Sequence, residues 1–221
     1  KIQAISERIP VVADKHFLIS PRALSPEILS QYPFMVDGLT YAVCTHGSGI
    51  VRINFREYTI NKNDLLMIYP YQVVEMKERN DSFSLEFLVI ALDMFTHMPS
   101  IPHLDIDNIA ELPSCVRLNS EEKKRIMEFY AFIRKKASRK DGVFTEHIVR
   151  SLLHAWRTEI SSVLYKYCRE KETEKELTSS RQEEISRMFF RLLYQYHKEE
   201  RGLNFYADKI CVTSKYLSAV I

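Results

Sequence analysis

The chain has 221 residues, of which 31 are Lys or Arg and 29 are Asp or Glu, so its formal net charge is +2. Hydrophobic residues make up 46% and charged residues 27% of the sequence, which is ordinary for a folded globular protein and excludes wholesale disorder. The length suits one large or two modest domains. A charge balance this even does not by itself indicate a nucleic-acid or membrane partner.

No part of the sequence predicts a membrane span, because the longest apolar run, Phe83–Leu92, is interrupted by Ser84 and Glu86 and a span needs roughly 18 apolar residues. No secretory signal peptide is visible. The chain starts at Lys1 and stops at Ile221 inside an apolar helical pattern, and we interpret it as a fragment of a longer protein.

The cysteines are scattered and do not form a C-x-x-C motif or a set with His at metal-ligand spacing. We therefore expect no disulfide framework, no zinc site and no cofactor, and we expect reduced cysteines in a cytoplasmic protein. The four are Cys44, Cys115, Cys168 and Cys211.

The first 119 residues carry short β-branched and aromatic runs at close spacing, a pattern typical of an antiparallel sandwich or barrel. Turn residues such as His46–Gly49 and Asn61–Asp64 separate them, and prolines predict a loop with one short turn over Pro99–Leu118. The predicted strands are His16–Ser20, Leu39–Thr45, Gly49–Phe55, Tyr58–Ile60, Asp64–Tyr69, Gln72–Met76 and Phe83–Leu92.

After residue 119 the apolar period becomes helical. Asn119 and Glu122 predict a capping box at the start of one helix, and a second helix is expected from about Val143 to Tyr167. Apolar residues recur along the second helix at alternating spacings of four and three, which is a heptad-like seam. This seam either packs inside its own domain or joins two copies as a dimer interface. It consists of Val149, Leu153, Trp156, Ile160 and Val163.

The charged segment Cys168–Leu177 predicts a solvated helix end or a linker. Ser180 and Glu183 then predict a second capping box, followed by a helix that continues to about Lys198 and ends before Gly202. The chain therefore divides into residues 1–119, 120–179 and 180–221.

The segment Phe205–Ile221 has the spacing of a helix-turn-helix. Ala207 suits a close helix crossing, Cys211 a tight turn, and Leu217 a second helix that packs back on the first. The opposite side of the second helix would then face a DNA groove, where Lys215 could donate to guanine or to a phosphate. The candidate DNA-binding residues are Ser214, Lys215, Tyr216, Ser218 and Ala219.

Tyr206–Leu217 closely resembles the first helix-turn-helix of AraC/XylS-family transcription regulators. Asp64–Pro70 is similar to the "G-D-hydrophobic-P" strand of the family's cupin-like sensor domain, with Asn63 where Gly is usual. The resemblance implies an α+β fold with an N-terminal antiparallel cupin-like β-barrel, a helical dimerisation segment with its linker, and a DNA-binding domain. That domain would be truncated after its first helix-turn-helix.

As a function, the resemblance implies a bacterial, sequence-specific transcription regulator rather than an enzyme. The expected partners are double-stranded DNA, a second copy of the chain and a small organic effector such as a sugar, with RNA polymerase as a further candidate and no membrane.

The rival interpretation is a metal-dependent cupin enzyme. Such an enzyme needs an H-x-H pair, a nearby carboxylate and a later His. The first strand pair offers only His46, and Val74 stands where the later His is expected, with Glu75 as its nearest polar neighbour. We therefore expect no metal site and no catalytic residues.

A metal-free barrel could still bind an effector, and His46, Arg52 and Tyr69 are the candidate pocket residues. A third hypothesis makes the barrel a dimerisation scaffold without a ligand.

Overall fold

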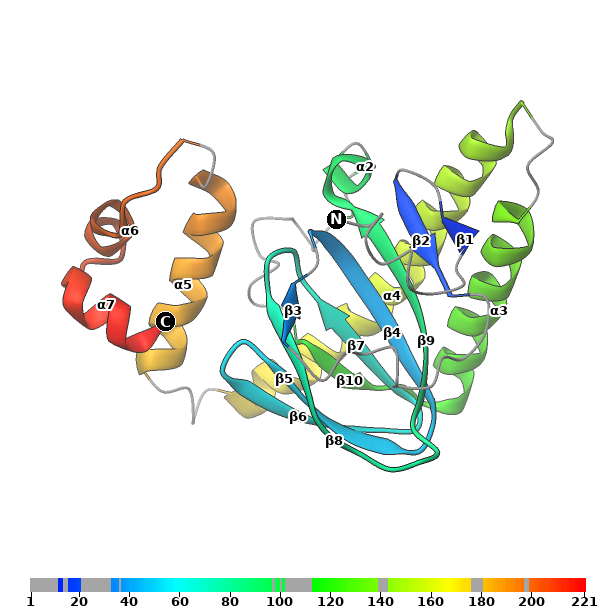
Figure 1. The fold of residues 1–221 in the computed structure, drawn as a ribbon, viewed down its shortest axis with the longest axis horizontal. Helices are drawn as coiled ribbons and strands as arrows, with labels where there is room; N and C mark the ends of the chain where they lie inside the picture. The colour runs from blue at the N-terminus through cyan, green and yellow to red at the C-terminus, as the bar shows by residue number, and fades with distance from the viewer. Residues whose placement is uncertain are drawn as a thin grey trace. The chain divides into compact units, whose positions relative to one another are not determined.

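The computed structural model describes residues 12–13, 16–20, 33–35, 37–96, 98–99, 101, 113–138, 143–175, 181–196 and 199–221 (Figure 1). The chain divides into two compact units. The first contains residues 1–99 and 113–163, and the second contains residues 100–112 and 164–221. None of the helices formed by the described residues is long and apolar enough to cross a membrane.

The described strands of the first unit form two antiparallel sheets. Six strands lie in the order β1 (Val12–Ala13), β2 (Phe17–Ile19), β9 (Ser84–Ala91), β4 (Gly38–His46), β7 (Asp64–Ile68) and β10 (Cys115–Arg117). Four strands lie in the order β3 (Phe34–Met35), β8 (Val73–Arg79), β5 (Ser48–Ile53) and β6 (Arg56–Asn61).

The antiparallel sheets were predicted correctly, but the closed barrel was not. No strand pair among the described residues joins one sheet to the other, so the sandwich alternative describes the fold. The chain passes between the sheets at tight turns. At the β4–β5 turn Gly47 has a φ of +69°, and an added Cβ would lie 2.5 Å from the backbone nitrogen of Phe83. Asn63, with a φ of 75°, makes the predicted turn between β6 and β7.

The prediction of a loop over Pro99–Leu118 was wrong at its end, where β10 pairs with β7 in the register Arg117↔Asp64. Asp64 explains the pairing. Its buried carboxylate accepts a 2.7 Å hydrogen bond from the backbone nitrogen of Asn61 and forms an ion pair with Arg117. A strand of three residues is too short for alternation to show in the sequence. Residues 102–112 of the predicted loop lie outside the described part of the chain.

Alternate residues of β4 face two different layers. Ala42 and Cys44 point into the core between the sheets. Tyr41 points to the other side of the six-stranded sheet and meets Trp156 edge-to-face, with ring centroids 5.1 Å apart. The core between the sheets consists of Ala42, Cys44, Val51, Ile53, Ile60, Leu66, Ile68, Val74, Phe83 and Leu85.

Helices cover the face of the six-stranded sheet that is turned away from the four-stranded sheet (Figure 1). The short α2 (Leu92–Thr96) follows β9, and α3 (Ser120–Ala137) begins with the predicted capping box of Asn119 and Glu122. α4 (Thr145–Lys175) is longer than predicted, because the charged segment after Cys168 continues the helix.

The second unit contains the end of α4 followed by α5 (Arg181–Tyr196), α6 (Leu203–Ile210) and α7 (Ser214–Val220). The capping box predicted at Ser180 and the linker predicted around residues 176–179 lie outside the described residues. The predicted division at residues 119 and 179 stays a prediction. The two compact units are a different division, in which the break within α4 lies between Val163 and Leu164.

Candidate functional site

The turn between α6 and α7 has the geometry that the sequence predicts. Cys211 ends α6 in the left-handed conformation, with a φ of 60°, and its backbone N–H donates to the carbonyls of Ala207 and Asp208. Thr213 then caps α7, because its hydroxyl accepts from the backbone nitrogen of Tyr216 at 3.1 Å. Two short helices are thus held at a fixed angle by a turn of three residues, Cys211–Thr213.

A small apolar core joins α5, α6 and α7. Ala207 and Leu217 are fully buried in it, and the absence of a larger side chain at Ala207 lets the helices approach closely. Phe189 of α5 meets Tyr206 edge-to-face at 5.4 Å. Burial raises the pKa of the Tyr206 hydroxyl, which donates to the carbonyl of Glu200 at 2.7 Å. The core therefore fixes α7 against two other helices.

Four of the five predicted DNA-binding residues lie on the open side of α7. Lys215, Tyr216, Ser218 and Ala219 are exposed, and Leu217 between them is buried. Ser214 differs, because its hydroxyl donates to the Asn204 side chain at 2.5 Å. The structure brings these residues together on one short helix, and their contact with DNA stays a prediction.

Lys209 has a role that the sequence analysis missed. Its ammonium lies 4.8 Å from the ring centroid of Tyr196 and 5.1 Å from that of Phe205, so it interacts with two aromatic faces. The spacing of Phe205 and Lys209, one helical turn apart, could have indicated this contact. Lys209 thereby ties the last turn of α6 to α5.

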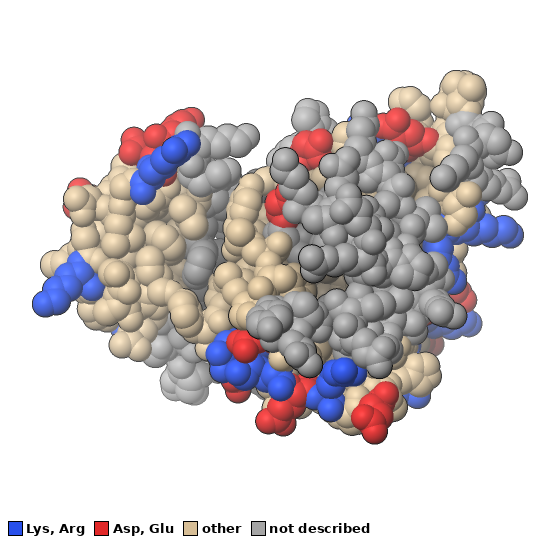
Figure 2. Space-filling view, viewed as in Figure 1, with Lys and Arg blue, Asp and Glu red and all other residues tan. Residues whose placement is uncertain are grey.

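The helices α6 and α7 carry one basic residue each, Lys209 and Lys215. On the face drawn in Figure 2, uncharged surface dominates α6 and α7, and basic residues are isolated. Lys215 of α7 therefore stands apart as an exposed cation on the predicted recognition helix.

The structure does not bring His46, Arg52 and Tyr69 together. His46 is exposed at the end of β4, and Tyr69 is buried just after β7. Arg52 lies on the face of β5 opposite to Val51 and Ile53, which belong to the core between the sheets. Arg52 is therefore outside the interior where an effector pocket was expected.

Thr40 is the polar side chain of β4 that does face the interior. Thr40 lies on the same face of β4 as Ala42, and Tyr41 lies on the opposite face. The buried Thr40 hydroxyl has no hydrogen-bond partner among the described residues. The sequence offered no signal for it, because a threonine in a strand is unremarkable. A buried hydroxyl without a partner costs stability unless a ligand or water satisfies it.

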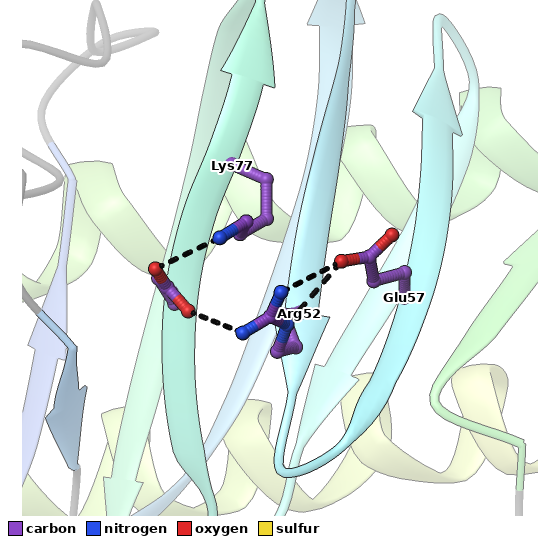
Figure 3. Close-up of polar contacts among 4 residues, drawn as sticks. Arg52, Glu57 and Lys77 are labelled. Atoms are coloured by element: carbon purple, nitrogen blue, oxygen red, sulfur yellow. Dashed lines mark hydrogen bonds and ion pairs between the residues drawn. The ribbon is translucent and has the colours of Figure 1, made fainter.

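The metal positions of a cupin enzyme hold other side chains here. Val74, at the expected His position, is buried in the core between the sheets, and Glu75 forms ion pairs with Arg52 and Lys77 (Figure 3). Within the described ranges no group of three or more His, Cys, Asp or Glu residues could hold a metal ion. The expectation of a metal-free protein stays a prediction.

The predicted dimer seam is buried within the single chain. All five residues are at most 5% exposed, and the Trp156 indole donates to the carbonyl of Ile126 at 3.0 Å. Packing inside its own unit, the alternative that the sequence left open, accounts for the seam. Two copies could meet through these side chains only if α4 unpacked, so the burial favours packing inside the chain over the predicted dimer interface. The five are Val149, Leu153, Trp156, Ile160 and Val163.

No model of a known protein family matches the sequence, and no curated protein matches it significantly. Among solved structures, a variant of ToxT from Vibrio cholerae aligns over 94% of this chain and 93% of its own, with 11% identity and a TM-score of 0.42. The AraC-like transcriptional activator CuxR aligns over 92% and 68%, with 10% identity and a TM-score of 0.38. Oxalate decarboxylase OxdC from Bacillus subtilis aligns over 57% and 35%, with 10% identity and a TM-score of 0.26. Similarity at this level does not assign the chain to a family.

Proposed function

We propose that the chain is a sequence-specific DNA-binding transcription regulator that reads DNA through α6 and α7. The observation that carries the proposal is the turn at Cys211 together with the buried pair Ala207 and Leu217. This arrangement supports a helix-turn-helix, in which the second helix enters the major groove. The sequence resemblance of Tyr206–Leu217 to AraC/XylS-family regulators points to the same function, which such a protein performs in the cytoplasm.

In this proposal Lys215 contacts a guanine edge or a phosphate, Ser218 donates or accepts a hydrogen bond, and Ala219 meets a thymine methyl group. Tyr216, which is 40% exposed, contacts the DNA backbone. Ser214 contributes less than the sequence suggested, because its hydroxyl is bonded to Asn204. Lys209 stabilises the three-helix core rather than the complex, since its ammonium is held over two rings.

The two lysines provide a matched test. Selection from random duplexes should return an enriched sequence, and binding to it is then measured by fluorescence anisotropy over a salt series. Lys215→Met should weaken binding by about 1–3 kcal/mol if it contacts a base, or reduce the salt slope by about 1 if it contacts a phosphate.

Lys209→Met removes the same charge, keeps the packing on the rings, and should leave both quantities unchanged once folding is confirmed by circular dichroism. Selection that enriches no sequence, with binding that depends on salt alone, would refute sequence-specific recognition.

We further propose that the effector binds between the two sheets beside Thr40. The surrounding interior is apolar, so a ligand with many hydroxyls, such as a sugar, would leave polar groups unsatisfied there. A small apolar molecule with one polar group fits this lining better. Partly buried aromatic and sulfur-containing side chains adjoin the core and supply contacts for such a molecule: Phe34, Tyr58, Met76, Phe87 and Cys115.

Thr40→Val tests the effector site, because it keeps the volume and removes the unpaired hydroxyl. A thermal-shift panel of sugars, aromatic acids and medium-chain fatty acids should give a response that Thr40→Val abolishes. The variant itself should be at least as stable as the wild type. A panel that leaves the melting temperature unmoved would favour the scaffold hypothesis, in which this unit binds no ligand.

A further inference from the structure

A side-chain hydrogen bond joins the beginnings of α6 and α7. The hydroxyl of Ser214, the first residue of α7, donates to Oδ1 of Asn204, the second residue of α6, at 2.5 Å. The turn Cys211–Thr213 brings the two residues together although they are ten positions apart in the chain. The Asn204 side chain is therefore held beside the N-terminal end of α7.

This bond fixes which atoms Asn204 offers to a ligand. Asn204 is exposed, and its Nδ2 makes no hydrogen bond within the part of the chain that the structure describes. Because Oδ1 accepts from Ser214, the orientation of the amide is set and its N–H groups point away from that contact. The exposed end of the side chain is a pair of donors, which suits a ligand that accepts hydrogen bonds.

Asn204 adjoins the face of α7 that we propose to read DNA. Ser214 and Ser218 are one helical turn apart and share one side of α7, and the exposed Lys215 follows Ser214 directly. In a helix-turn-helix the second helix enters the major groove, while the first helix crosses the phosphate backbone. Asn204 belongs to the first helix and contacts the start of the second, so it lies where the groove meets the backbone.

Charged donors are scarce at this place. Lys209 and Lys215 are the basic residues of α6 and α7, and the ammonium of Lys209 is held over the rings of Tyr196 and Phe205. Phosphate contacts from these two helices must therefore come largely from neutral donors. Neutral side chains, asparagine among them, supply many of the phosphate contacts in protein–DNA complexes.

We propose that the amide of Asn204 donates a hydrogen bond to a DNA phosphate, and that Ser214 positions this amide. The inference rests on the proposed function, because it names a further contact of the same DNA-reading unit. A phosphate contact carries no sequence information, but it fixes the register of the protein on the duplex. Asn204 thereby sets how Lys215 and Ser218 enter the groove, and Ser214 acts through Asn204 rather than on DNA directly.

Fluorescence anisotropy tests the pair on the duplex that selection returns and on its single-base-pair variants. Asn204→Ala removes one neutral hydrogen bond and should weaken binding about three- to tenfold on every duplex. The salt slope should not change, because a neutral amide releases no counterion. Asn204→Asp still accepts from Ser214 but turns a carboxylate toward the phosphate, so its loss should be larger. Ser214→Ala should weaken binding less than Asn204→Ala and add nothing to it in the double variant.

Lys209→Met is the matched control, because it also makes the net charge of α6 one unit more negative. It should leave binding unchanged. Circular dichroism and the melting temperature confirm that every variant is folded, and Asn204→Asp keeps the bond to Ser214. Wild-type affinity of Asn204→Asp overturns the proposal. A loss that Asn204→Ala shows at one base pair only also overturns it, since Asn204 would then read a base.

Backbone substitution locates the contact. A methylphosphonate replaces one charged phosphate oxygen with a methyl group, and it is scanned along the enriched duplex. One position should weaken binding by the wild type but not by Asn204→Ala, because that variant no longer uses the lost oxygen. If no such position exists while the wild type binds DNA, this inference alone is overturned. A wild type that binds no duplex overturns the proposed function together with it.

Discussion

Replacing Tyr130 with Phe removes one hydroxyl from the contact between α3 and the six-stranded sheet. That oxygen lies 2.6 Å from Ser20 Oγ, 2.9 Å from the carbonyl of Ser20 and 3.1 Å from the carbonyl of Phe87. Ser20 in turn joins β2 to β9, because its hydroxyl accepts from the backbone nitrogen of Phe87 at 3.1 Å. The substitution therefore leaves the ring packing unchanged and breaks a hydrogen-bond network across three elements.

The cost can be worked out from burial. Tyr130 is 2% exposed, so water cannot replace the lost hydroxyl, and Ser20 is left with unsatisfied polar atoms. An unsatisfied buried group costs about 1–3 kcal/mol, and we expect the free energy of unfolding to fall by that amount. Trp156, the single tryptophan, lies 6.4 Å from the Tyr130 ring and reports the unfolding of this unit by fluorescence in urea.

Tyr58→Phe is the matched control, because its hydroxyl makes no hydrogen bond to any described residue and its change should stay within about 0.5 kcal/mol. Combining Tyr130→Phe with Ser20→Ala should show a coupling of about 0.5–3 kcal/mol, since both remove the same contact. Equal urea midpoints and slopes for Tyr130→Phe and the wild type would refute the network's contribution to stability.

Three further outcomes are expected. Gly47→Ala should cost about 2 kcal/mol or more in urea unfolding, because φ is positive and backbone atoms of Phe83 occupy the Cβ position; an unchanged midpoint would show that the turn can relax. Thiol titration with Ellman's reagent should modify exposed Cys211 quickly, while Cys44 and Cys115 react only on unfolding. Burial, followed by the nearby Asp64 charge, raises the pKa of Cys44 to about 11 and of Cys115 to about 12. The folded state thus keeps thiol protons that the unfolded state loses. The contribution of these protonated thiols to the free energy of unfolding is complete below about pH 9 and is lost as pH rises through 11–12. Urea midpoints that stay level over that range would contradict the last expectation.

The turns and the main strands were predictable because their causes are local. Asn61–Asp64 and His46–Gly49 contain the residues that tolerate a positive φ, and the structure places Asn63 and Gly47 in that conformation. The strands between them are long enough for their composition to show. The local spacing also predicted the turn at Cys211, although cysteine rarely adopts the left-handed conformation that this turn requires.

What the sequence could not provide depends on partners distant in the chain. The heptad-like spacing of Val149 and Leu153 indicates an apolar face, but not whether a sheet or a second helix covers it. Here Tyr41, more than a hundred residues earlier, meets Trp156 of the same face. Arg52 was equally ambiguous, because the alternation of β5 shows two faces without saying which one is inside.

The same alternation gives the proposed effector site a physical connection to α4. Thr40 and Tyr41 are consecutive in β4, so Thr40 faces the interior between the sheets while Tyr41 contacts Trp156 on the opposite side. In the proposed site a ligand beside Thr40 would shift β4, and the contact of Tyr41 with the tightly packed Trp156 would carry that shift to α4. α4 is one continuous helix from Thr145 to Lys175, and it begins in the first compact unit and ends in the second. In this proposal a binding event inside the sheets is therefore felt at Trp156 and in the part of α4 that belongs to the first compact unit.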